Sequence, residues 1–291
     1  MRKVAFIINP ASGTGSRSSL IRSIERYFCP QNGWLVELYR TTGAHDAFHA
    51  AWRYKEESFD LVVAVGGDGT VNHVAQALIY SSVHLGIIPV GSGNGLARDL
   101  KIPLSVTKAI KVILKEKVTS IDSGTVNGHP FFCTAGVGFD ANLANRFNAA
   151  TVRGLPSYLA LSAVEYVHYH PEVYKIRVGE RYLEREAFLI TFANCAQWGN
   201  DVYIAPEASA TDGLLDMVIW KKTSAVTFPL IAMRLLMGNI DHSQYVETIR
   251  SASFSIERAQ DGWVHVDGED IQMGRELSIE VHPASVKVIT P

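Results

Sequence analysis

Hydrophobic residues gather along this chain in short runs that end in glycine. The run Leu61–Val65 leads directly into Gly66, Gly67 and Gly69, and apolar residues at helical spacing resume at Val71. Four to eight apolar, β-branched residues bounded by glycine are typical of a strand buried inside a parallel sheet. The pattern therefore predicts a strand, a glycine-rich loop and a helix in direct succession.

The same succession recurs through the first 116 residues. The apolar runs span 4–8, 34–39 and 85–89, and the helical patterns span 18–28, 46–55 and 107–116. Repeated strand–loop–helix units predict a parallel sheet with right-handed crossovers. Ligands of such sheets bind at the carboxyl ends of the strands, so we expect the glycine loops to line one binding edge.

After Ile121 the pattern changes to short β-type runs separated by turn dipeptides such as Asn127-Gly128 and Asp267-Gly268. This predicts a mostly antiparallel second domain. We place an α/β domain over 1–123, to which the last strand, 285–291, could return, and a β-rich domain over 124–284. The strands expected in the second domain span 124–127, 130–135, 174–178, 188–193, 215–219, 254–258, 263–267 and 277–282, with helices over 158–169 and 225–237.

Composition narrows the functional classes. The chain has 291 residues, 47% of them apolar and 19% charged, with a net charge of −2. These values fit a globular protein with a sizeable core and give no general attraction to nucleic acid. Cys29, Cys133 and Cys195 are too far apart for a metal motif and are typical of reduced thiols in a cytoplasmic protein, which we expect here.

The glycine loop around Asp68 suggests chemistry as well as structure. The helix that follows it leaves backbone N–H groups unpaired, which favours an anion such as a phosphate. A carboxylate repels phosphate unless a cation lies between them, so Asp68 predicts a bound metal ion or a metal-ordered water. The alternative is a tight turn closed by an Asx-type hydrogen bond.

Four motifs occur here in the order seen in the diacylglycerol-kinase-type lipid kinases, which include bacterial soluble lipid kinases and sphingosine kinases. They are Asn9-Pro-Ala-Ser-Gly13, Gly66–Thr70, Gly91-Ser-Gly-Asn-Gly95 and Asp267-Gly-Glu269. The resemblance covers nearly the whole chain. It implies an α/β domain that binds ATP, a mostly antiparallel β-sandwich domain, and an active site in the cleft between them.

The resemblance also implies roles for individual residues. Asp267 would be the general base, with Glu269 as its neighbour, although Asp-Gly is also a common hairpin turn. Phosphoryl transfer needs positioning, a Mg²⁺ to offset phosphate charge and a carboxylate to accept a proton, and these residues supply that set. Contacts to ATP or its metal would come from Asn9, Ser12, Thr41, Gly67, Asp68, Gly69, Thr70, Ser92 and Asn94.

Two further segments resemble the family. Asp140 would face the polar head of the acceptor, or else cap a helix that follows it. Asp212, the carbonyl of Leu214 and Asp216 would bind a structural Mg²⁺, or else form a hairpin at Asp212-Gly213. Gly95 stands where many bacterial members carry Asp, so a link through that residue from the structural metal to the ATP site would be missing.

We therefore predict an ATP- and Mg²⁺-dependent kinase whose acceptor is a lipid hydroxyl, as in diacylglycerol or a sphingoid base. An NAD-kinase-like small-molecule kinase and a catalytically silent nucleotide- or lipid-binding regulator are the alternatives. The expected partner is a lipid substrate, with transient contact to a membrane surface; a homodimer is left open. The apolar helix over 225–237 could face either a lipid or the core.

Overall fold

The computed structural model describes residues 1–13, 17–43, 45–149, 164–166, 168–224 and 226–291. The chain divides into two compact units: unit 1 contains Met1–Ile121 and Ala284–Pro291, and unit 2 contains Asp122–Pro283. Two long strands, β5 (Val118–Val126) and β18 (Glu276–Ile289), begin in one unit and end in the other. Most of the helix predicted over 158–169 lies outside the described residues.

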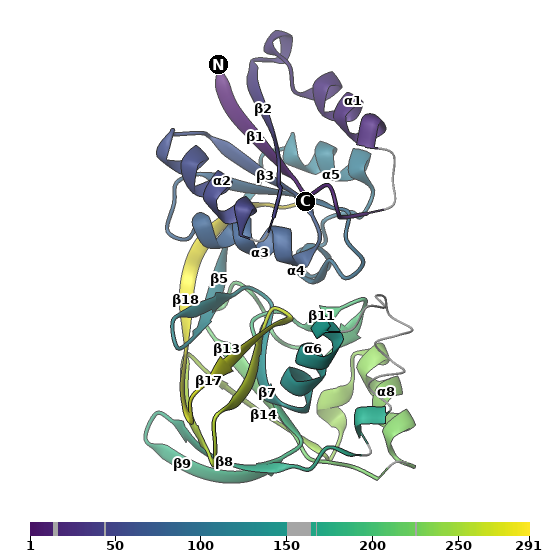
Figure 1. Cartoon of the computed structure of the whole chain (residues 1–291), viewed down its shortest axis with the longest axis vertical. Coiled ribbons are helices and arrows are strands. Elements are labelled where there is room, and N and C mark those ends of the chain that lie inside the picture. Colours follow the sequence, from purple (N-terminus) through teal and green to yellow (C-terminus); the bar gives the residue numbers. More distant parts are fainter. Residues whose placement is uncertain (14–16, 44, 150–163, 167, 225) are drawn as a thin grey trace. The chain divides into compact units, whose positions relative to one another are not determined.

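Unit 1 is built on a parallel sheet with the strand order β2-β1-β3-β4, of which Figure 1 labels the first three strands. The end of β18 lies beside β4 in the same direction, with Val288 opposite Leu85. The predicted parallel sheet is confirmed. Its four strands are β1 (Arg2–Ile8), β2 (Trp34–Arg40), β3 (Leu61–Gly66) and β4 (His84–Pro89).

Helices connect these strands in the predicted order. Every residue of β3 is buried, as expected for a strand of a parallel sheet that helices cover. The helices of unit 1 are α1 (Arg17–Tyr27), α2 (Asp46–Glu56), α3 (Asp68–Ala77), α4 (Gly95–Asp99) and α5 (Val106–Ile113), with a 3₁₀ turn at Pro30–Asn32.

Unit 2 contains two antiparallel sheets. In the first, β15 lies between β8 and the beginning of β18, β9 forms the edge, and β5 pairs with β18 and β6. The connection of β8 to β9 is the predicted two-residue turn Gly179-Glu180. The strands not yet given are β6 (His129–Phe131), β8 (Glu172–Val178), β9 (Arg181–Ala187) and β15 (Ser253–Arg258).

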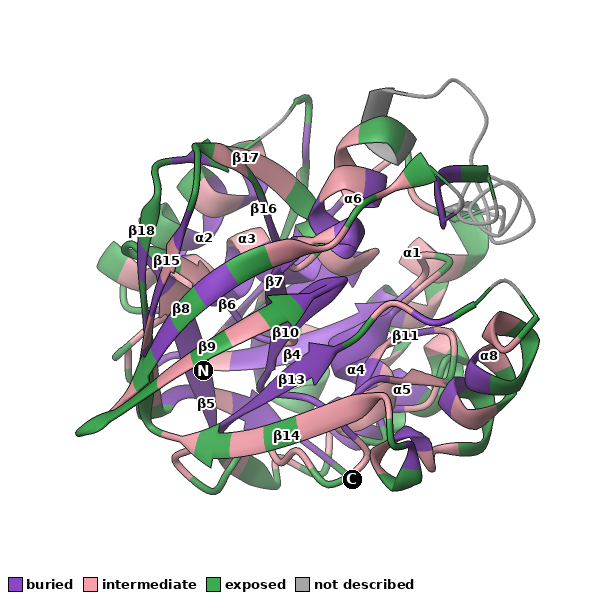
Figure 2. Ribbon diagram, turned by 90° about the horizontal axis from the view of Figure 1, so that it is seen from below, coloured by how far each residue is buried: buried purple, intermediate pink, exposed green. Residues whose placement is uncertain are grey.

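The second sheet of unit 2 has the order β14-β13-β10-β7-β16-β17. Its central strands β10 and β13 are buried, whereas β14 at the edge is partly exposed (Figure 2). The strands are β7 (Thr134–Gly138), β10 (Leu189–Ala193), β13 (Leu215–Trp220), β14 (Val246–Ser251), β16 (Gly262–Val266) and β17 (Glu269–Met273), with a small ribbon of β11 (Gln197–Gly199) and β12 (Val202–Tyr203).

One hydrophobic core joins the two sheets of unit 2. Ile176 and Ile256 from the first sheet share it with Ile190, Phe192 and Val264 from the second. This packing confirms the predicted antiparallel sandwich. The unit also contains the helices α6 (Phe139–Ala149) and α8 (Phe228–Met237) and a 3₁₀ turn at Ile240–His242. None of the helices in the described ranges has the length and hydrophobicity that crossing a bilayer requires.

Several strand predictions for the second domain differ from the structure, and two of the differences have identifiable reasons. The strand expected over 130–135 is split into β6 and β7, because the N–H groups of residues 132–134 bond to the carboxylate of Asp267 instead of a strand. The sequence did not predict the strand β9. Its charged residues, Arg181, Glu184, Arg185 and Glu186, obscure the alternation of apolar and polar positions that indicates a strand. Charged residues of this kind are common on edge strands.

A buried arginine closes the β16–β17 hairpin. Arg258, at the end of β15, is 4% exposed, and burial lowers the pKa of its guanidinium. It donates to the carbonyl oxygens of Gly262 at 2.8 Å, Trp263 at 3.1 Å and Met273 at 2.7 Å. These bonds hold both strands of the hairpin against β15.

We expect Arg258→Lys to lower the free energy of unfolding by about 3 kcal/mol, because an ammonium cannot replace the forked donors and leaves carbonyls unpaired. Urea unfolding followed by circular dichroism measures this. The matched control is Arg177→Lys at an exposed position of β8, where a change within about 0.5 kcal/mol is expected. Equal losses in the two variants would contradict the assignment.

Candidate functional site

The loops that follow β3 and β4 are joined by one carboxylate. Asp68 begins α3, and its Oδ2 accepts the N–H of Asn94 at 2.8 Å while its Oδ1 accepts the N–H of Gly95 at 2.6 Å. These donors lie at the start of α4, where a helix leaves N–H groups without partners. Asp68 therefore fixes the second glycine loop to the third.

The glycines of these loops are needed for close backbone approach. A Cβ at Gly91 would lie 2.4 Å from Cα of Gly67, and a Cβ at Gly93 would lie 2.5 Å from Oδ2 of Asp68. Both distances are far shorter than any van der Waals contact. Only glycine lets the two loops meet in this way.

Polar side chains from the other strand ends complete the arrangement. Nδ2 of Asn9, directly after β1, donates to Oγ1 of Thr70 at 3.1 Å. The N–H of Thr41, directly after β2, donates to the carbonyl of Ile8 at 3.0 Å. Asn94 closes its own loop, because its amide bonds both the N–H and the carbonyl of Gly91.

The structure thus places all nine predicted nucleotide residues at the carboxyl ends of the unit 1 strands. It divides them by exposure. Thr41, Thr70 and Asn94 are buried and hold the loops, whereas Gly69 and Ser92 are exposed. Ser12, Gly67 and Asp68 are partly exposed, as is Asn9. The exposed groups and the N-terminus of α3 are the parts of this edge that a phosphate could reach.

The residues of this edge fit a Mg²⁺ that is carried by a nucleotide. Within the described ranges, no three His, Cys, Asp or Glu side chains are grouped to hold a metal by themselves. Mg²⁺ bound to phosphates keeps several waters and needs only one or two carboxylates. Asp68 is the carboxylate that the glycine loops provide.

In unit 2, Asp267 lies at the turn of the β16–β17 hairpin. Asp267 and Gly268 have φ angles of 48° and 87°, as in a two-residue type I′ turn. Oδ2 accepts the N–H of Phe132 at 2.7 Å, and Oδ1 accepts those of Cys133 at 2.8 Å and Thr134 at 2.9 Å. The residue is therefore a hairpin turn and also a carboxylate fixed by three backbone donors.

The neighbours of Asp267 differ in exposure. Glu269 begins β17 and is exposed. The carboxylate of Asp270 is partly exposed and accepts Nδ2 of Asn145, in α6, at 2.7 Å. The helix α6 is thus bonded to the hairpin that carries Asp267 and Glu269.

Asp140 is buried rather than open to a ligand. Its Oδ2 accepts Oγ1 of Thr191 at 2.8 Å and lies 3.0 Å from Nε2 of His265, and its Oδ1 accepts the N–H of Ala141. Asp140 and His265 are 6% and 4% exposed. A Cβ at Gly136 would lie 2.5 Å from the same carboxylate, so glycine makes room for the pair.

Our sequence reasoning did not single out His265. It lies two residues before Asp267 in β16, so the period of two along a strand was the available signal. The hydrogen bond between Asp140 and His265 fixes α6 to β16, the strand that directly precedes Asp267. The predicted contact of Asp140 with an acceptor stays a prediction.

The segment proposed for a structural metal is held by an arginine. Asp216, in β13, is 3% exposed and accepts Nε of Arg250 at 3.0 Å and Nη2 at 3.3 Å. Burial raises the pKa of Asp216, and Arg250 opposes that shift. Asp212 is exposed and accepts the N–H of Leu214. The guanidinium of Arg250 thus already supplies a positive charge beside Asp216, and the metal predicted at Asp212, Leu214 and Asp216 stays a prediction.

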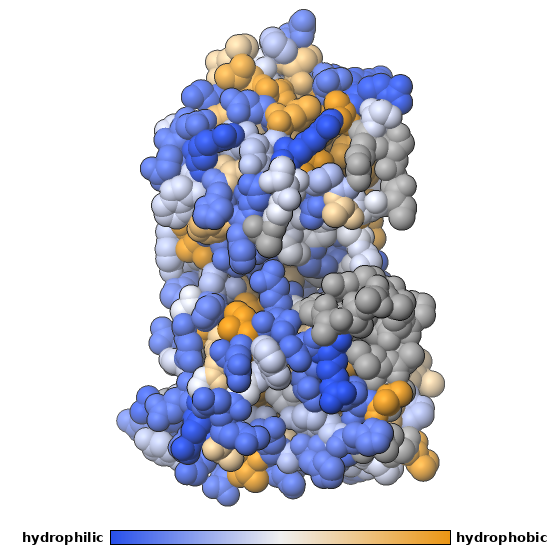
Figure 3. Space-filling view, viewed as in Figure 1, coloured by the Kyte–Doolittle hydropathy of each residue, from blue (hydrophilic) through white to orange (hydrophobic). Residues whose placement is uncertain are grey.

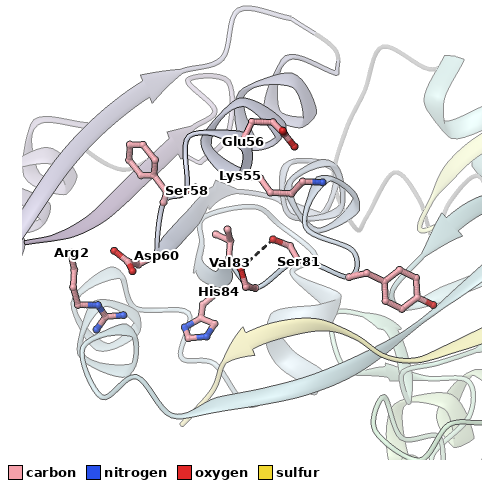
Figure 4. A pocket seen from close by; sticks show the side chains of 11 residues that line it. Arg2, Lys55, Glu56, Ser58, Asp60, Ser81, Val83 and His84 are labelled. Atoms are coloured by element: carbon pink, nitrogen blue, oxygen red, sulfur yellow. Dashed lines mark hydrogen bonds between the residues drawn. The ribbon is translucent and has the colours of Figure 1, made fainter.

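A hollow of about 630 Å³ lies elsewhere in unit 1, at the amino ends of β3 and β4 (Figure 4). Asp60 and His84 line it, together with Arg2. Burial and the charge of Lys287 lower the pKa of His84. Because the glycine loops follow the carboxyl ends of the strands, this hollow is not part of the candidate site.

Two family profiles match the chain in succession. Residues 3–126 match the profile described as "Diacylglycerol kinase catalytic domain". Residues 133–290 match the profile described as "YegS C-terminal NAD kinase beta sandwich-like domain". The first covers the glycine loops, and the second covers Asp140, Asp216 and Asp267.

Proteins that are similar to this chain along its length support the same family. The chain is 30% identical over 276 residues to a diacylglycerol kinase of Bacillus subtilis, a match that covers 92% of this chain and 90% of that protein. It is 29% identical over 252 residues to "Probable lipid kinase YegS" of Escherichia coli, covering 83% of each. A crystal structure of a diacylglycerol kinase from Bacillus anthracis has the same fold, with a TM-score of 0.77 and 21% identity over 100% of this chain and 97% of that one.

We expect Gly91→Ala to lower the free energy of unfolding by about 2 kcal/mol, because the new methyl group would overlap the backbone of Gly67. Urea unfolding measures the loss. Gly43→Ala is the matched control in another loop of unit 1, since a Cβ there meets no atom within 4 Å. It should change stability by no more than about 0.5 kcal/mol. If the two variants were equally stable, the loops would not be in contact as described.

Proposed function

Because this chain belongs to the diacylglycerol-kinase-type family of lipid kinases, we propose that it transfers the γ-phosphate of ATP to a hydroxyl group of a lipid. Phosphotransfer is the activity that the family shares. The acceptor class, the nucleotide, the metal and the residue roles are our inference. The observation that supports the proposal best is the carboxylate of Asp68, which joins two glycine loops at the strand ends.

We assign nucleotide binding to unit 1. The N-terminus of α3 and the exposed groups of Gly69 and Ser92 would approach the phosphates, with Ser12 beside them. The buried members of the set, Thr41, Thr70 and Asn94, would keep the loops in place without direct contact. Mg²⁺ would arrive with the nucleotide, near Asp68, and offset the phosphate charge.

In the proposal, the residue that accepts the proton of the lipid hydroxyl belongs to unit 2. In the proposed step, a lipid hydroxyl oxygen forms a bond to the γ-phosphorus, the bond from that phosphorus to the bridging oxygen breaks, and ADP leaves. The hydroxyl proton passes to Asp267, with Glu269 as its neighbour. Three backbone donors hold the Asp267 carboxylate in place, which would fix the oxygen that orients the hydroxyl and accepts its proton.

The acceptor is expected to be a lipid alcohol such as diacylglycerol, a sphingoid base or a related lipid. Relatives of this chain are named for diacylglycerol and for lipid in general. Asp140, buried against His265, would act on the acceptor only through the position of Asp267.

An NAD-kinase-like activity is the second candidate. The observation in its favour is that the profile matching residues 133–290 is described as similar to the NAD kinase sandwich. The profile that matches the glycine loops favours a lipid kinase instead. A regulator without activity, which binds nucleotide or lipid, is the third outcome that an assay must distinguish.

The decisive experiment incubates the protein with ATP labelled at the γ-phosphate and a total lipid extract, with Mg²⁺ or with EDTA. A labelled product in the organic phase that depends on Mg²⁺ supports the proposal, and its identity names the acceptor. Label in NAD added as a competing acceptor would support the second candidate. ATP binding without any labelled product would support the regulator.

We expect Asp267→Asn to lower lipid phosphorylation by at least about 100-fold, because the amide cannot accept the proton. Binding of ATP, measured by calorimetry, should change little. Asp261→Asn is the matched control, since Asp261 is an exposed aspartate that also precedes a glycine, and its activity should stay within about twofold of the parent. Circular dichroism confirms that both variants fold. A folded Asp267→Asn protein at the parent rate would remove the base assignment.

A further inference from the structure

A buried amide side chain bonds to the segment that holds Asp267. It belongs to Asn194, which directly follows β10 and is 0% exposed. Polar side chains usually lie at the surface, and hydrophilic residues cover much of the face seen in Figure 3. Burying an amide costs stability unless hydrogen bonds compensate for it. The bonds of Asn194 therefore indicate what the residue contributes.

The side chain of Asn194 donates to two backbone carbonyl oxygens. Its Nδ2 donates to that of Phe132 at 2.8 Å and to that of Asp122, in β5, at 3.0 Å. Because both partners are acceptors, only the NH₂ end of the amide can face them. The Oδ1 atom is buried, and none of the described residues donates to it. The amide thus contributes through its two N–H donors, at the cost of an unpaired acceptor.

The backbone of Asn194 bonds to the same segment. The N–H of Asn194 donates to the carbonyl of Cys133 at 2.8 Å, and the N–H of Cys195 donates to that carbonyl at 3.1 Å. Two successive residues therefore lie opposite one, as in a β-bulge, a feature that is frequent next to active sites. Sγ of Cys195 also donates to the carbonyl of Phe132, at 3.3 Å.

Each of these carbonyls shares a peptide group with a donor to Asp267. The carbonyl of Phe132 and the N–H of Cys133 form one peptide group, and the carbonyl of Cys133 and the N–H of Thr134 form the next. These two N–H groups donate to Oδ1 of Asp267 at 2.8 and 2.9 Å. Since a peptide group is planar, a bond that fixes its carbonyl also fixes the direction of its N–H. Asn194 therefore orients both N–H groups that hold Oδ1.

We propose that Asn194 is a positioning residue for Asp267. Its side chain fixes one peptide group and its backbone N–H fixes the next, and together they fix the carboxylate. The inference rests on the proposed function, in which Asp267 accepts the proton of the lipid hydroxyl. Because Asn194 is fully buried, it contacts neither substrate. It acts on the rate of phosphate transfer and not on the binding of ATP.

The test is Asn194→Ser, which removes the amide and leaves a hydroxyl too short to bond both carbonyls. We expect kcat for lipid phosphorylation to fall at least about tenfold, because a displacement of about 1 Å at a reacting group costs up to about 100-fold in rate. The KM for ATP should stay within about twofold of the parent. Rates are expressed per ATP-binding site counted by calorimetry, so that unfolded protein does not contribute. Asn194→Leu, which has no donor, should lower kcat at least as far.

Thr223→Val is the matched control. Thr223 is a 7% exposed residue of unit 2, and its Oγ1 lies 2.6 Å from the hydroxyl of Tyr166, so valine also removes a buried hydrogen bond. The control should lose stability as the Asn194 variants do, but its kcat per site should stay within about twofold of the parent. Equal losses of kcat in Thr223→Val and Asn194→Ser would overturn the proposal, because deletion of any buried polar group would then have the same effect.

A double-mutant cycle separates positioning from general damage. In the Asp267→Asn background, Asn194→Ser should lower the residual rate by less than about twofold, because the carboxylate that Asn194 positions is absent. The same loss in both backgrounds would contradict the proposal, as would a folded Asn194→Ser protein at the parent rate. An Asp267→Asn protein at the parent rate would remove the base assignment and, with it, the role of Asn194.

Hydrogen exchange of the N–H groups of Cys133 and Thr134, followed by NMR, tests the same contact without turnover. Both should exchange at least about tenfold faster in Asn194→Ser than in the parent, since their peptide groups lose a partner. Unchanged exchange would mean that Asn194 does not hold the segment, and the proposal would fail. Faster exchange in a protein that transfers no phosphate would support the positioning and remove the kinase assignment.

Discussion

The hydrogen bonds from Asp68 to the N–H groups of Asn94 and Gly95 are the constraint on which the candidate site depends. A charged acceptor makes such bonds roughly twice as strong as neutral ones, so one side chain can fix two loops. The fixation works only because Gly67 and Gly91 let the backbones touch. Backbone contacts and one carboxylate therefore hold the loops of this edge in place before any ligand binds. This lowers the conformational entropy that would be lost on binding.

In unit 2, Asp267 likewise accepts hydrogen bonds from several backbone N–H groups. Its carboxylate gathers three backbone N–H groups and thereby interrupts a strand that would otherwise be continuous. Arg258 holds the hairpin from one side, and the contact of His265 with Asp140 holds it through α6. Phosphoryl transfer depends mainly on positioning and electrostatics, and a carboxylate fixed in this way serves positioning.

A cation of the chain itself has a further structural role. Arg250 neutralises Asp216 inside unit 2, at a place where the sequence suggested a metal. A guanidinium satisfies a buried carboxylate by two directed bonds and needs no ion from solution.

The sequence by itself determined the parallel sheet, the antiparallel sandwich and the loops of the site, because glycine runs and turn dipeptides act through local backbone geometry. Predicted residues such as Asn9, Asp68 and Ser92 do lie at neighbouring strand ends. Only the tertiary structure decided what Asp68 and Asp267 bond to, since their donors lie 26 and about 130 residues away in the chain. It also decided which face of α8 is buried, because a helix whose one charged residue is Arg234 has too few polar positions to show a period. Long-range partners and burial follow from packing, which no local pattern encodes.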